Sequence, residues 1–316
     1  AIYAIMGALG DLQNKGKKGT FLGINKQILQ DAIEAGGIKT ETNLAIARND
    51  PIAKALAYTL NEKIPGISGD EIASHNFLEG KNIRTTTELD EQRTLLDLSE
   101  REKKTLNTGL VQYAIIEQGM DAAIMNKLIT TNYIFQKMNF NGHLADGKEL
   151  RKLLNACGRT NNPSLGLAII LGDPQAYEKV QKVLSEYKKT IQKGSRWGKK
   201  NLQEKSHVRI LYGDDVIDDR KIGTVISIIL HSENYEDKPI IGYANSDHNT
   251  YKISSRASQS LVKKGLDLGQ VMGDTIKTLD IDFMGGGHPP AAGAKVPREK
   301  IEKFLEIANE EVKKML

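Results

Sequence analysis

Three consecutive glycines and a histidine near the carboxyl end form the pattern in this chain best suited to binding chemistry. Gly285, Gly286 and Gly287 lack side chains, so a ligand can approach their backbone closely and their φ can be positive. Such a run of bare N–H groups can form an anion-binding nest, and the ring of His288 can donate to a phosphate oxygen. The structural alternative is a glycine turn before a strand, but the following Pro-Pro-Ala-Ala-Gly favours a binding site.

Two further segments offer groups that bind phosphate. Ser254 and Arg256 stand two residues apart in a segment that reads as a strand, so their side chains share a face. A hydroxyl and a guanidinium on one face can clamp a phosphate, although this alternation also arises by chance on exposed strands. Arg159 follows a predicted helix at a constrained turn and offers a planar fork, with a structural salt bridge as the alternative.

One aspartate has the position of a metal ligand. Residues 1–6 are apolar and read as a short buried strand, which places Asp11 near its carboxyl end. Ligands of open α/β sheets bind at that edge, and a carboxylate suits Mn²⁺ or Mg²⁺. The alternative is that Asp11 caps the next helix or turn. The polar loop 12–20 then adds three lysines that either face phosphate or are solvated.

Composition limits the classes of protein that this chain can represent. It has 316 residues, enough for two domains, with 39% apolar and 27% charged residues, as in soluble globular proteins. No apolar run approaches the roughly 20 residues of a membrane span. The net charge of +4 gives no global nucleic-acid signal, so any basic surface is local. One cysteine, Cys157, excludes an intramolecular disulfide and fits a reducing cytoplasm.

Periodicity and turn residues predict helices in the first half and alternating strands and helices from about residue 206. In the first half, helices are expected at 24–35, 50–60, about 70–77, in several pieces over 87–138, and at 146–157 and 165–171. In the second part, strands are expected at 208–212, 239–244, 251–256 and 291–296, and helices at 219–230, 268–279 and 298–315.

A long basic helix is predicted over 173–205 between these two parts. Its lysines and arginines either form a solvated face or line a cleft where they contact phosphates. Gly194 and Gly198 are expected to kink it, and Trp197 between them favours packing over stacking on a base. The other histidines show no metal-ligand spacing; they are His75, His143, His207, His231 and His248.

These motifs together resemble one family. Gly-Gly-Gly-His with its small-residue tail, ahead of a strand and a final helix, resembles the signature of the DHH-associated domain of DHH-family phosphoesterases. The Asn-Ala-Cys-Gly-Arg segment that ends at Arg159 and the Ser-Ser-Arg segment that ends at Arg256 resemble RecJ motifs. Ala-Leu-Gly-Asp, ending at Asp11, resembles the fourth DHH motif, whose Asp binds metal. The chain is therefore similar to RecJ-like single-strand exonucleases, in particular the archaeal type.

The resemblance implies an α/β protein of two domains. Residues 1–172 would be the carboxyl-terminal part of a parallel-sheet DHH catalytic domain with a helical insertion, 173–205 a connecting helix, and 206–316 a mixed-sheet DHH-associated, substrate-binding domain. The implied activity is metal-dependent hydrolysis of single-stranded DNA or RNA, with Asp11 as the catalytic metal ligand. The implied contacts to substrate phosphate come from Asn155, Arg159, Ser254, Arg256, Gly286, Gly287 and His288.

The sequence departs from the family pattern at the metal site. The family uses two Mn²⁺ or Mg²⁺ ions, yet the chain has no Asp-His-His and no Asp-x-Asp, and only Asp11 matches a metal motif. We therefore expect that this chain alone does not assemble the two-metal centre. Because it opens on Ala1 as though in mid-strand, we expect the missing ligands upstream.

Two other functions stay open. One is a DHH phosphoesterase for short oligoribonucleotides or 3′-phosphoadenosine phosphate, although the helical insertion favours the larger RecJ type. The other is a non-catalytic replisome scaffold that binds the GINS complex. Retention of Asp11, Arg159, Arg256 and His288 argues against such a decayed site.

Overall fold

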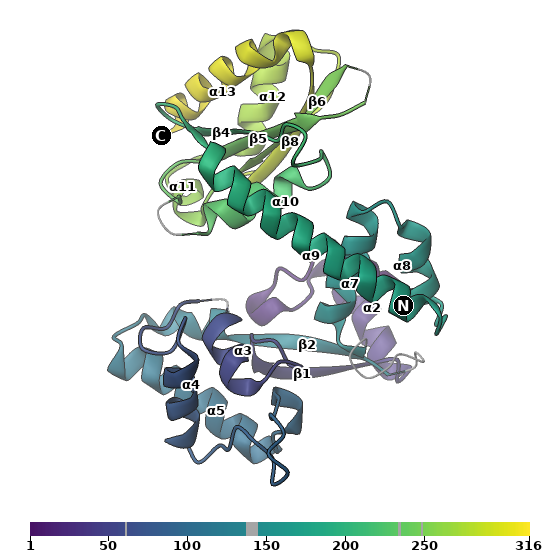
Figure 1. The fold of residues 1–316 in the computed structure, drawn as a ribbon, viewed down its shortest axis with the longest axis vertical. Coiled ribbons are helices and arrows are strands. Elements are labelled where there is room, and N and C mark those ends of the chain that lie inside the picture. The colour runs from purple at the N-terminus through teal and green to yellow at the C-terminus, as the bar shows by residue number, and fades with distance from the viewer. Residues whose placement is uncertain (61, 137–144, 233–234, 248) are drawn as a thin grey trace. The chain divides into compact units, whose positions relative to one another are not determined.

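The computed structural model describes the chain except residues 61, 137–144, 233–234 and 248, so His143 and His248 lie outside the described part. It divides into two compact units (Figure 1): residues 1–155 with 163–177, and residues 156–162 with 178–316. The predicted α/β class is confirmed. Among the described helices, none is both long and apolar enough to cross a membrane.

The amino-terminal segment is a helix, α1 (Ile2–Gly10), and not the predicted strand. Its buried residues are Ile5, Met6, Ala8 and Leu9. This spacing of i, i+1, i+3 and i+4 is helical, but a short apolar run does not separate a strand from a buried helix by periodicity. Asp11 consequently stands at the C-cap of α1, the helix before it, and neither at the end of a strand nor at the start of the next helix.

The first unit combines helices with a two-stranded sheet. Its helices are α2 (Gly23–Glu34), α3 (Ile52–Tyr58), α4 (Glu71–Glu79), α5 (Glu100–Gln112), α6 (Met125–Leu128), α7 (Gly147–Arg159) and α8 (Pro163–Ile170), and α7 extends into the second unit. Strands β1 (Ile38–Leu44) and β2 (Ile129–Phe135) pair antiparallel, whereas the sequence predicted a parallel sheet here. β2 lies inside the stretch that was predicted to be helical. It forms a strand because its β-branched and aromatic residues favour that conformation.

The helical layer of this unit begins later than predicted. Thr87, the expected helix start, instead lies in a turn, where its hydroxyl accepts from the Leu89 and Glu91 amides. Helix α5 starts at Glu100 behind a capping box, in which the Ser99 hydroxyl and the Glu102 carboxylate satisfy each other's backbone amides. Helix α4 begins behind Asp70, whose carboxylate accepts from the Ile72 and Ala73 amides.

Glu102 gives a pH-dependent prediction. Arg93 donates two hydrogen bonds to its carboxylate, at 2.9 and 3.0 Å, and with the Ser99 contacts this lowers the pKa to about 2 against the effect of burial. The carboxylate therefore stabilises the fold above pH 4.5, and this stabilisation is lost as the pH falls through about 2. Because water screens the pair, we expect Glu102→Gln to cost roughly 1–2 kcal/mol at pH 7.

Calorimetric unfolding of Glu102→Gln at pH 7 and pH 2 measures this difference. The expected loss of thermal midpoint at pH 7 shrinks strongly by pH 2, while Glu88→Gln, at an exposed turn, leaves the midpoint unchanged at both. A loss of the same size at both pH values would show that Glu102 acts through packing and not through its charge.

The second unit is built on one six-stranded mixed sheet of order β3-β4-β5-β6-β8-β7. The strands are β3 (Gln203–Glu204), β4 (Arg209–Tyr212), β5 (Ile240–Asn245), β6 (Thr250–Arg256), β7 (Gly285–His288) and β8 (Ala291–Pro297). The helices are α9 (Ala176–Asn201, which starts in the first unit), α10 (Ile222–Leu230), α11 (Gln259–Lys263), α12 (Leu268–Thr278) and α13 (Ile301–Met315).

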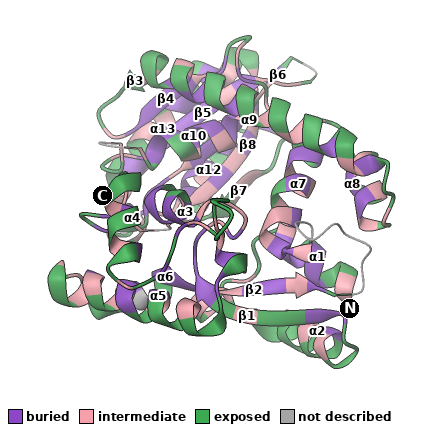
Figure 2. Cartoon of the chain, turned by 60° about the horizontal axis from the view of Figure 1, so that its bottom comes forward, coloured by how far each residue is buried: buried purple, intermediate pink, exposed green. Residues whose placement is uncertain are grey.

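Helices cover both faces of this sheet. Alternate strand residues point to opposite faces, so Ile241 joins the core under α12 and α13, while its neighbour Ile240 joins the core under α9 and α10. Figure 2 shows buried residues along the strands and exposed residues on the outer faces of the helices. The second unit therefore has three layers.

The two glycines of α9 serve packing and do not kink the helix, which runs unbroken. A Cβ on Gly198 would lie 2.8 Å from Ile229 Cδ1, and one on Gly194 would lie 3.2 Å from Val225 Cγ2. Bare backbone at both positions lets α9 approach α10 closely. Trp197 packs on the same core, as the packing interpretation predicted.

Candidate functional site

A cleft of about 620 Å³ opens in the second unit where β6, β7 and β8 meet the start of α10. Its charged lining residues are the cations Arg159, Arg220, Lys252, Arg256 and Lys295 and a single carboxylate, Asp219. Five positive charges against one negative charge give the cleft a strong preference for anions.

Ser254 and Arg256 share a face of β6, as predicted, and both line this cleft. Ser254 is buried, and within the described part of the chain its hydroxyl has no hydrogen-bond partner. Among the described residues, the Arg256 side chain donates only to the neighbouring Ser255 carbonyl, at 2.8 Å. Both side chains are therefore available to a ligand.

Arg256 is held in an environment that disfavours its own charge. Burial, and then repulsion by Arg159, lower the pKa of its guanidinium. Arg159 is the last residue of α7 and belongs to the second unit, where its Nη1 donates to the Tyr187 hydroxyl at 3.0 Å. The salt-bridge alternative for Arg159 finds no carboxylate partner among the residues described. A bound anion would offset the repulsion between the two arginines.

The glycine run is a strand and not the predicted loop. β7 pairs antiparallel with β8, with Gly285 opposite Ala294 and Gly287 opposite Ala292. A Cβ on Gly285 would lie 2.7 Å from Ile276 Cγ1, so this position lets α12 pack on β7. Gly287 has a φ of 151°, and a Cβ there would lie 2.6 Å from backbone atoms of β8.

Of the three glycines in this run, Gly286 alone has open space around it, with nothing within 4 Å of an added Cβ. Gly286 and Gly287 both line the cleft. Close packing of α12 and β8 on β7 therefore explains the glycine run. The extended backbone of this strand does not form the predicted nest of converging amides. Gly286 remains accessible to a ligand.

Three predicted site residues do not line this cleft. His288 is exposed and pairs with Ala291 at the end of the β7–β8 hairpin. Asn155 belongs to the first unit, where its Nδ2 donates to the Gly10 carbonyl at 3.3 Å, directly before Asp11. Asp11 is exposed, and its carboxylate accepts from Gln13 Nε2 at 2.8 Å.

The described residues do not fit a two-metal centre. Outside the undescribed positions, no group of three or more His, Cys, Asp or Glu side chains is placed to hold a metal ion. Within the part of the chain that is described, the Asp11 carboxylate contacts the Gln13 side-chain amide and no second metal ligand.

Sequence reasoning missed several residues of the cleft. Lys252 continues the i, i+2 alternation of Ser254 and Arg256, a signal that the sequence does contain. Lys295 lies directly opposite Lys252 in the β6–β8 register, which the sequence alone does not reveal. Gly223 at the start of α10 gives room to the clamp, since a Cβ there would lie 3.0 Å from Arg256 Nη2 and 3.1 Å from Ser254 Oγ.

Comparison with known proteins matches two parts of the chain to known domains. Residues 206–314 match the DHHA1 domain, and residues 47–129 match the DHH-CID domain. An uncharacterized protein of Methanocaldococcus jannaschii is 29% identical over 311 residues, which cover 98% of this chain and 62% of the relative. CDC45 from Entamoeba histolytica has a similar fold, with a TM-score of 0.52 and 11% identity over 99% of this chain and 69% of that one.

The chain therefore contains a DHHA1 domain and a DHH-CID domain. RecJ from Thermus thermophilus in complex with Mn²⁺ is another match, with a TM-score of 0.42 and 14% identity over 54% of this chain and 24% of that one. The chain spans about 62% of the length of the curated relative it matches. Apart from Arg159, its cleft lies wholly within the DHHA1 match.

Proposed function

We propose that this chain supplies the substrate-binding half of a RecJ-like enzyme that hydrolyses phosphodiester bonds of single-stranded DNA or RNA. In this proposal the cleft of the second unit holds the terminal phosphate of the strand. The observation that carries it is the placement of five cationic side chains and one carboxylate around the free hydroxyl of Ser254.

The geometry suggests a role for each group. The Ser254 hydroxyl and the Arg256 guanidinium donate to the oxygens of one phosphate, and Arg159 adds positive charge beside them. Lys252 and Lys295, opposite each other on β6 and β8, lie on the same cleft and would neutralise the following phosphates. Gly286 would let the strand pass close to the backbone.

The remaining predicted residues keep proposed roles outside the cleft. Asp11 would offer one carboxylate to an Mn²⁺ or Mg²⁺ ion, whose other ligands the described residues do not supply. Asn155 would steady the backbone next to Asp11 through its bond to Gly10. His288, exposed at the end of the β7–β8 hairpin, would contact the nucleic acid strand outside the cleft.

Binding of 5′-phosphorylated and 5′-hydroxyl single strands of one sequence, measured by fluorescence anisotropy, tests this proposal. Because charged hydrogen bonds to the end are worth about 1.5–3 kcal/mol, we expect at least about tenfold tighter binding of the phosphorylated strand. Both affinities should fall steeply with salt, as phosphate contacts require. Equal affinity for the two ends would refute terminal-phosphate recognition.

The same comparison bears on the alternative functions. A non-catalytic replisome subunit that binds GINS has no need of a terminal phosphate, and the likeness to CDC45 concerns the fold alone. A phosphoesterase for short oligoribonucleotides or 3′-phosphoadenosine phosphate would prefer those ligands to a long strand. Competition of these small ligands against the labelled strand therefore distinguishes the three candidate functions.

A further inference from the structure

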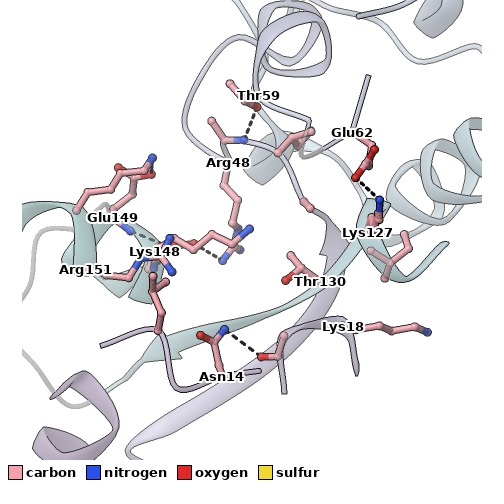
Figure 3. Close-up of a pocket in the computed structure, with 18 of the residues that line it drawn as sticks. Asn14, Lys18, Arg48, Thr59, Glu62, Lys127, Thr130, Lys148, Glu149 and Arg151 are labelled. Carbon is pink, nitrogen blue, oxygen red and sulfur yellow. Dashed lines mark hydrogen bonds and ion pairs between the residues drawn. The ribbon is translucent and has the colours of Figure 1, made fainter. Parts of the chain in front are cut away.

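A second basic cleft, of about 610 Å³, lies within the first unit (Figure 3). It is formed by the loop after α1, the segment after β1, the start of β2 and the start of α7. Its cationic lining residues are Lys18, Arg48, Lys127, Lys148, Arg151 and Lys152. Four carboxylates also line it, so its six cations outnumber its carboxylates.

Three of these carboxylates are already paired with cations of the same cleft. The pairs are Glu62–Lys127 at 2.5 Å, Asp146–Arg48 at 3.0 Å and Glu149–Lys152 at 2.7 Å. Within the described part of the chain, Lys18, Lys148 and Arg151 are left without a carboxylate partner, against one unpaired carboxylate, Asp50. Figure 3 shows Lys148 extending toward Arg48 and Lys18 pointing away from both.

Arg48 anchors this cluster from the segment after β1. Only 8% of its side chain is exposed, and its Nη atoms donate to Asp146 and, at 2.8 Å, to Glu41. Its Nε is buried and has no partner among the described residues. Buried donors of this kind are uncommon and require an acceptor. Asp146 is already committed, since it also caps α7 by accepting from the Lys148 amide at 2.8 Å.

The free cations on α7 carry an electrostatic penalty. Burial lowers the pKa of Lys148 to about 8, and repulsion by Arg151, Lys152 and Arg48 adds to this, while Asp146 opposes it. Burial also lowers the pKa of Arg151, against the attraction of Glu149 and Asp146. A bound anion would stabilise the charged form of both groups.

We propose that this cleft binds the phosphate groups of a nucleotide-sized ligand through Lys148 and Arg151, beside the Arg48 guanidinium. Its volume lies in the range of ordinary small-ligand pockets. The hydroxyl of Thr130 also lines the cleft and has no partner in the described chain, so it can contact the rest of the ligand. The site is lined only by residues of the first unit, so it does not depend on the function proposed above.

Isothermal titration of the full chain with ADP tests the site. A second titration, with a four-residue thymidine oligonucleotide without terminal phosphates, distinguishes a free nucleotide from a phosphodiester backbone as the source of the phosphate. Both titrations use an Arg256→Gln background, so that the cleft of the second unit contributes little. We expect Lys148→Gln to weaken binding at least tenfold. It should not lower the thermal midpoint, because it removes a penalised charge. Lys54→Gln, an exposed lysine of α3, is the matched control and should stay within twofold.

Each result decides the matter. If Lys148→Gln loses affinity for ADP and the Lys54 variant does not, the site is supported with a free nucleotide as its ligand. A loss confined to the oligonucleotide supports it with a phosphodiester backbone as the ligand. Equal binding by the Lys148 and Lys54 variants, or no binding of either probe by the parent protein, overturns the proposal.

Discussion

Arg256→Gln is expected to remove most of the preference for a 5′-phosphorylated end and to weaken binding of that strand by roughly 10- to 100-fold. Arg256 lines the cleft and has no carboxylate partner in the described chain, so the donors that do not bond to the Ser255 carbonyl are free for the phosphate. Each charged hydrogen bond lost is worth about 1.5–3 kcal/mol. Anisotropy titrations with phosphorylated and hydroxyl-ended strands measure both affinities.

The matched control is Arg101→Gln, which removes the same charge from an exposed position of α5 in the first unit. It should leave the preference for the phosphorylated end intact. Arg256→Gln should also lose less affinity for the hydroxyl-ended strand, which lacks the group it contacts. If both strands weaken equally in Arg256→Gln, this arginine provides only general attraction and the clamp does not exist.

Gly287→Ala is expected to destabilise the second unit by about 2–4 kcal/mol. Its φ of 151° is one that residues with a side chain rarely adopt. An added Cβ would also lie 2.6 Å from the Ala291 carbonyl oxygen and from Ala292 Cα, and backbone atoms have little room to move. The β7–β8 hairpin and the packing of α12 on it would both suffer.

Trp197 makes this change measurable, because it is the single tryptophan of the chain and packs in the core of the second unit. Its fluorescence during denaturation by guanidinium reports the midpoint of that unit. Gly286→Ala is the control, since its added methyl meets nothing within 4 Å, and its midpoint should stay close to that of the parent protein. Equal midpoints for the two variants would contradict the packing account of the glycine run.

The sequence allowed much of the second unit to be predicted, for physical reasons. Its strands and helices alternate with clear turn residues between them, so β5, β6, β8 and α12 lie within a few residues of their predicted positions. The first unit was harder. A six-residue apolar run at the amino end fits both a strand and a buried helix, and β2 lies beside helix-forming sequence.

The candidate site could be predicted only in part. Ser254 and Arg256 were found to share a face because alternation along one strand is a local property. The pairing of Lys252 with Lys295 depends on the register between strands, and the room beside Gly223 depends on how α10 packs. The strand conformation of the glycine run was missed because three glycines allow both a turn and close packing.

The most direct test of terminal-phosphate recognition is a crystal structure of the chain with a short 5′-phosphorylated single strand. We expect the 5′ phosphate in the cleft of the second unit, within roughly 3 Å of Ser254 Oγ and of the Arg256 guanidinium, as hydrogen bonds require. Arg159 and Gly286 should border it. A strand whose 5′ phosphate lies in solvent, or a base that fills the cleft in its place, would contradict the account.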